Sequence, residues 1–79
     1  MSRAENLGQC EELRIRRKMI EAEITSHCDS IRHAIPLTAE PAEMDGEYIM
    51  RLAIKLNERL QEWKGVTRKI DILERDLGV

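Results

Sequence analysis

Apolar residues recur every three or four positions from residue 49 to residue 77, and this repeat constrains the fold more than any other feature. Its a and d heptad positions hold Ile49, Leu52, Leu56, Arg59, Trp63, Val66, Ile70, Leu73 and Leu77. A spacing that averages 3.5 residues places these side chains in one stripe along a helix. Asp45 is positioned to cap the start and Gly78 to end it, so we predict a helix over residues 46–77.

A second stripe of the same spacing precedes the first along the chain. Its apolar members are Leu7, Cys10, Leu13, Ile20, Ile24, Cys28, Ile31, Ala34 and Ile35, and Arg17 and His27 fill the remaining a and d positions. Pro36 lacks a backbone donor and disfavours the helical conformation of the residue before it. The pattern therefore predicts a helix over about residues 4–35.

Residues 36–46 have the composition of a connector, with two prolines, a glycine and no basic residue. A second helix that starts at Thr38, with Pro41 in its first turn, is the alternative. A connector this short makes the two helices antiparallel neighbours. We therefore predict one all-α domain over residues 1–79, a coiled-coil-like antiparallel two-helix hairpin.

The antiparallel register follows when residue 35 lies beside residue 46. It places Cys10 opposite Ile70, Arg17 beside Trp63 in cation–π geometry, and Glu21 near Arg59. It likewise pairs Ile20 with Leu60, Ile24 with Leu56, and Ile31 with Ile49. The predicted seam comprises Leu13, Ile20, Ile24, Ile31, Ile49, Leu52, Leu56, Leu60, Trp63, Val66, Ile70 and Leu73.

The apolar face of the second helix is wider than one partner helix can cover, because Ala53, Leu60 and Thr67 extend it at e positions. A chain of 79 residues also has a small core that usually needs support from a metal, a disulfide or a partner. Two hairpins packed face to face in a four-helix bundle would cover both stripes, so we predict a homodimer. A hairpin docked on a different protein, a higher oligomer and a monomer are the alternatives.

The sequence contains no arrangement of residues that predicts enzymatic or metal chemistry. Ser26, His27, Asp29 and Ser30 point in different directions on one helix, so they cannot converge as a catalytic group. His27, Cys28 and His33 lack the i, i+4 spacing of a helical metal clamp, and Asp29 with His33 reads as a surface i, i+4 pair. We expect no cofactor and no metal.

The compartment is predicted from the apolar segments of the chain, and the state of the cysteines follows from the compartment. No secretory apolar segment opens the chain, and no apolar run approaches the roughly 20 residues of a membrane span. We expect a soluble cytoplasmic protein without a membrane partner. Cys10 and Cys28 are then expected as reduced thiols, with a bridge between two chains as the alternative.

The leading functional interpretation comes from apolar residues on the outer helix faces. These are Ile15, Met19, Met50, Ile54 and Ile72, which suit recognition by a groove on a larger protein. Gly65, across from Ile15, would permit close approach of another helix or mark a bend. The sequence thus favours a non-enzymatic protein–protein interaction module, an adaptor, small subunit or inhibitor, that acts as a homodimer.

The alternative function is binding of RNA or DNA through a basic belt at the middle of the hairpin. Its proposed contacts are Arg14, Arg16, Lys18, Lys64, Arg68 and Lys69, with Arg17 and Arg59 close by. Clustered bases attract phosphate backbones. The formal net charge of −2 is close to neutral and argues against strong non-specific attraction of the whole chain.

Overall fold

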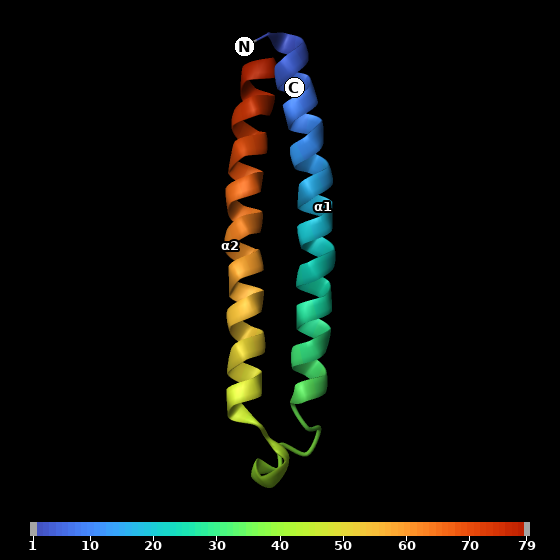
Figure 1. The fold of residues 1–79 in the computed structure, drawn as a ribbon, viewed down its shortest axis with the longest axis vertical. Helices are drawn as coiled ribbons and strands as arrows, with labels where there is room; N and C mark the ends of the chain where they lie inside the picture. The colour runs from blue at the N-terminus through green and yellow to red at the C-terminus, as the bar shows by residue number, and fades with distance from the viewer. Residues whose placement is uncertain (1, 79) are drawn as a thin grey trace.

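A computed structural model describes residues 2–78 and shows two antiparallel α-helices packed side by side (Figure 1). Helix α1 spans Arg3–Ala34 and helix α2 spans Gly46–Leu77, each 32 residues long. Together they form a rod with extents of 59 × 15 × 14 Å. The start of α1 and the end of α2 lie at one end of the rod, and the connector lies at the other. The predicted antiparallel helical hairpin is confirmed.

Helix α1 begins with a capping box. The Ser2 side chain accepts a hydrogen bond from the Glu5 backbone at 3.2 Å, and the Glu5 carboxylate accepts one from the Ser2 backbone at 3.3 Å. This Ser-x-x-Glu motif is a sequence signal for a helix start, and it places the start one residue before the predicted one. The helix ends where Ile35, directly before Pro36, adopts an extended conformation.

Helix α2 has both of the predicted caps. Asp45 accepts a hydrogen bond from the Tyr48 backbone at 3.1 Å, which satisfies one of the free donors of the first turn. Gly78 ends the helix in the left-handed region with a φ of 76°, and its N–H donates to the Glu74 and Arg75 carbonyls. Glycine is favoured there because it has no Cβ to clash.

The connector contains a single turn of 3₁₀ helix, η1, over Pro41–Glu43. The alternative start of the second helix at Thr38 is therefore wrong, because this turn ends before α2 begins at Gly46. Proline is accommodated in η1 since it lies in the first turn, where its missing N–H would have no partner in the helix.

The core is thin and is best packed at the end of the rod far from the connector. Its buried side chains are Cys10, Ile20, Leu52, Ile70 and Leu77. Cys10, Ile70 and Leu77 form one cluster, with Leu13, Val66 and Leu73 packed against it. Contact between Cys10 and Ile70 agrees with the predicted register. Both cysteines are free thiols.

Candidate interaction surfaces

Two ion pairs between the helices mark opposite sides of the rod. Arg16 Nε donates to Glu62 Oε1 at 3.1 Å, and both residues occupy g positions of their heptads. Arg14 Nη2 donates to Glu74 Oε1 at 3.0 Å, and both of these occupy e positions. Positions e and g flank the a/d seam on either side. The rod therefore has a g side and an e side that can be compared.

The g side is charged along the middle of the rod, and we call Arg16, Glu23, Arg59 and Glu62 the charged flank. The Glu62 carboxylate accepts a hydrogen bond from Arg16, and its Oε2 lies 3.0 Å from Arg59 Nη1. Arg59 Nη1 also donates a hydrogen bond to Glu23 Oε2 at 3.3 Å. The hydrogen bond from Arg16 lowers the pKa of the Glu62 carboxyl below its ordinary range and raises the pKa of the Arg16 guanidinium. These charges compensate one another between the two helices.

The predicted proximity of Glu21 to Arg59 is wrong as an ion pair. Arg59 contacts Glu23 and Glu62, while Glu21 accepts a hydrogen bond from Trp63 Nε1 at 3.1 Å. Heptad geometry explains why Glu21 binds Trp63 and not Arg59. A d position such as Arg59 borders the g side, whereas an a position such as Trp63 borders the e side, where Glu21 lies. The predicted stacking of Arg17 on Trp63 stays a prediction.

The e side loses its charges toward the connector. In steps of seven residues from the Arg14–Glu74 pair it carries Glu21 with Thr67, then Cys28 with Leu60, and then, where α1 has ended, Ala53 of α2 alone. Met50, at a neighbouring b position, extends the uncharged part. We call Cys28, Met50, Ala53 and Leu60 the apolar flank. Cys28 is half-buried and the other three side chains are exposed.

One partner helix covers the predicted seam only in part. Ile20, Leu52 and Ile70 are buried; Leu13, Ile24, Ile31, Ile49, Leu56, Trp63, Val66 and Leu73 are half-buried; Leu60 is exposed. Leu60 is 37% exposed because its e position lies beside the seam rather than in it. Apolar surface along the seam thus remains open to solvent on the e side.

The five residues predicted as a partner surface are all exposed, at 48–57% of their accessible area. They do not form one patch. Ile15 and Met19 lie on the side of α1 that faces away from α2, and Ile54 and Ile72 lie on the side of α2 that faces away from α1. Met50 belongs to the apolar flank. Ile15 and Met19 lie one turn apart on α1, and Met50 and Ile54 lie one turn apart on α2.

The six predicted nucleic-acid contacts are also dispersed, and two of them are paired with carboxylates. Arg14 is bound to Glu74, which raises the pKa of its guanidinium, and Arg16 is bound to Glu62. The other four, Lys18, Lys64, Arg68 and Lys69, are exposed and make no ion pair within residues 2–78. They occupy b, f and g positions, so no single face collects them.

Gly65 faces open space. A Cβ added at this position would meet no atom within 4 Å outside its own helix. The prediction that Gly65 permits a close approach therefore does not apply to α1, whose Ile15 lies on an outer face instead. A methyl group would fit at this position.

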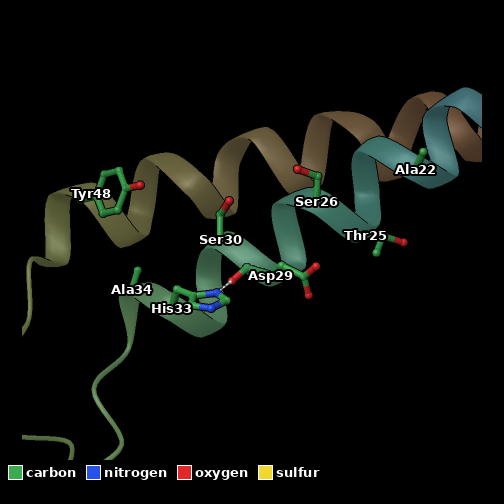
Figure 2. A pocket seen from close by; sticks show the side chains of 8 residues that line it. All are labelled: Ala22, Thr25, Ser26, Asp29, Ser30, His33, Ala34 and Tyr48. Atoms are coloured by element: carbon green, nitrogen blue, oxygen red, sulfur yellow. Dashed lines mark hydrogen bonds between the residues drawn. The ribbon is translucent and has the colours of Figure 1, made fainter.

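An open hollow near the connector gathers hydroxyl groups on α1 with Tyr48 of α2 (Figure 2). His33 Nδ1 lies 2.7 Å from the backbone oxygen of Asp29, whose carboxylate instead binds Arg32 at 3.0 Å. Asp29 and His33 thus form an exposed i, i+4 pair as predicted, but through the Asp29 backbone oxygen, because Arg32 binds the carboxylate. Neither Ser26 nor Ser30 donates a hydrogen bond to His33 in the described chain.

Within residues 2–78, no group of three or more His, Cys, Asp or Glu side chains is placed to hold a metal ion. Neither α1 nor α2 in this described part has a stretch long and apolar enough to cross a bilayer.

Comparison of the chain with profiles of protein families, with characterised proteins and with solved structures finds no match.

Proposed function

We propose that the chain is a non-enzymatic helical interaction module that acts as a homodimer and binds a larger protein. The observation that carries this proposal is the balance of apolar side chains. In residues 2–78, eleven large hydrophobic side chains are exposed, whereas five hydrophobic residues are buried. Where such exposed apolar side chains are neighbours, they mark places that other proteins cover. An adaptor, a small subunit and an inhibitor all work in this way.

The outer face of α1 is the part of the rod that best suits a larger protein. Ile15 and Met19 are 55% and 54% exposed, and Ala22 continues their stripe by one turn. Glu11 and Lys18 border the stripe with charges of both signs. Apolar anchors at i, i+4 and i+7 on a charged helix are the pattern that a hydrophobic groove recognises.

Affinity capture with matched variants tests this surface. Ile15→Glu/Met19→Glu places two charges on the outer face of α1, and the control Ile54→Glu/Ile72→Glu places the same charges on the outer face of α2. We expect one host protein to be retained by the wild type and the control and to be depleted at least tenfold by the α1 variant. Circular dichroism would verify that both variants stay helical. Equal retention by all three chains would contradict the proposal.

Nucleic acid has weaker support as the partner. Its favourable feature is the set of exposed bases Lys18, Lys64, Arg68 and Lys69. Against it, the two arginines in ion pairs have neutralised their charge between the helices. Binding to a mixed RNA and DNA pool at two salt concentrations separates the two functions, because phosphate contacts weaken steeply with salt. We expect no binding at physiological salt.

A further inference from the structure

Building on the proposed self-association, we infer that a second copy of the chain covers the apolar flank. In this dimer the two hairpins lie side by side with their connectors at the same end. Both the surface and the direction follow from how area and charge are distributed along the rod.

The exposed area exceeds that of a compact monomer by about the area of one interface. The chain exposes 5955 Å². A compact monomer of 9.2 kDa exposes about 4,900 Å², so the excess is about 1,000 Å². A stable dimer of standard size buries about 800 Å² on each partner. Burying one side of the rod against a second copy would therefore remove most of the excess.

Charge decides which side is buried. The charged flank places Arg16, Glu23, Arg59 and Glu62 where a partner would have to remove them from water, which is costly. The side chains of the apolar flank carry no charge and come from both helices, and Arg32, at the b position one turn from Cys28, is paired with Asp29. The apolar flank also borders the a positions, so a partner seated on it would cover the half-buried side chains of Ile31, Ile49 and Leu56. Their coverage completes the core of a four-helix bundle.

The direction of the second copy follows from the charges of the e side, which are present far from the connector and absent near it. A two-fold axis parallel to the rod places each α1 against the α2 of the other copy. Cys28 then meets the partner's Leu60, and Arg14 meets the partner's Glu74, which has the opposite charge. An axis perpendicular to the rod at its middle would instead lay the uncharged half of one copy on Arg14, Glu21 and Glu74 of the other, and an axis nearer the connector would leave most of the rod without a partner. Complementarity therefore favours the parallel axis.

Sedimentation of single-charge variants tests the surface. We expect a wild-type dimer at micromolar concentration. Leu60→Glu and Ala53→Glu, both at exposed positions on the apolar flank, should raise the dissociation constant at least 100-fold. The control Ile54→Glu adds the same charge on the outer face of α2 and should leave it within threefold of the wild type.

Two other results would contradict self-association or the position of the interface. A monomeric wild type would overturn self-association altogether, and with it the homodimer in the proposed function. A dimer that tolerates both Leu60→Glu and Ala53→Glu would overturn only the apolar flank as its interface, whatever the effect of Ile54→Glu. Helicity measured on each variant separates loss of the dimer from loss of the fold.

A distance measurement between spin labels tests the direction. The label is attached at Leu37, which is fully exposed in the connector. Cys28→Ala removes the half-buried thiol, and the remaining Cys10 is buried and therefore protected from labelling. With a label on Leu37→Cys, connectors at the same end should give a separation below about 30 Å, given helix packing distances of 8–10 Å. A separation that approaches the 59 Å length of the rod would overturn the parallel axis.

Discussion

Trp63 donates its indole Nε1–H to the carboxylate of Glu21 at 3.1 Å and thereby joins the two helices near the middle of the rod. Because Trp63 is the only tryptophan of the chain, its fluorescence reports directly on this contact. The pair also separates the polar half of the e side from the apolar flank.

Removal of the Glu21 acceptor should weaken the hairpin modestly. We expect Glu21→Ala to lower the free energy of unfolding by about 0.5–1 kcal/mol, since the hydrogen bond is exposed to water. Glu21→Gln keeps an acceptor oxygen and should lose less. Urea unfolding followed by tryptophan fluorescence measures both, and an equal loss in the two variants would show that the hydrogen bond contributes nothing.

Truncation of the most buried side chain should be far more damaging. Ile20 is 0% exposed, so Ile20→Ala leaves a cavity and should cost about 2–5 kcal/mol. This is a large part of the stability of so small a domain. Thermal unfolding by circular dichroism measures the loss. Ile15→Ala, at an exposed site, is the control and should change the unfolding free energy by less than about 0.5 kcal/mol.

Replacement of the glycine inside α2 should stabilise the protein. A Cβ at Gly65 meets nothing within 4 Å, so Gly65→Ala gains helix propensity of about 1 kcal/mol without a clash. Gly78→Ala is the opposing control, because a φ of 76° strains any residue with a Cβ, and it should destabilise. The prediction fails if Gly65→Ala lowers the melting temperature.

The stability of the hairpin should fall in acid partly through Glu62. Its pKa is lowered in the folded state by the hydrogen bond from Arg16. Stabilisation from this carboxylate is therefore fully present above the unfolded value of about 4.3 and is lost as the pH falls through the lower folded value. Glu62→Gln should reduce the pH dependence of unfolding in this window. Identical pH profiles of variant and wild type would contradict the role of this pair.

The helices and their ends could be predicted because they depend on local sequence. Pro36, Asp45 and Gly78 act on neighbouring backbone, and the stripe that contains Leu52 and Ile70 needs only periodicity. The Ser2–Glu5 capping box was equally accessible to sequence reasoning.

Predictions about the flanks depended on more than periodicity. The partner of Arg59 is decided by which heptad positions border each side of the seam, and a register alone does not specify this. Ile15 and Ile54 are both exposed as outer-face residues, but antiparallel packing puts them on opposite sides of the rod. Pairing of Arg14 with Glu74 depends on side-chain geometry between helices, which charge counting cannot show.

The tightest cluster, which contains Cys10 and Ile70, also has consequences for the speed of folding. Cys10 and Ile70 are 60 residues apart along the chain and lie at the end of the rod farthest from the turn. Contacts between residues far apart along the chain have the greatest entropic cost of loop closure, unless the structure between them forms first. We therefore expect the helices to pair from the connector outward, so that the contact between the buried Cys10 and Ile70 is among the last to form.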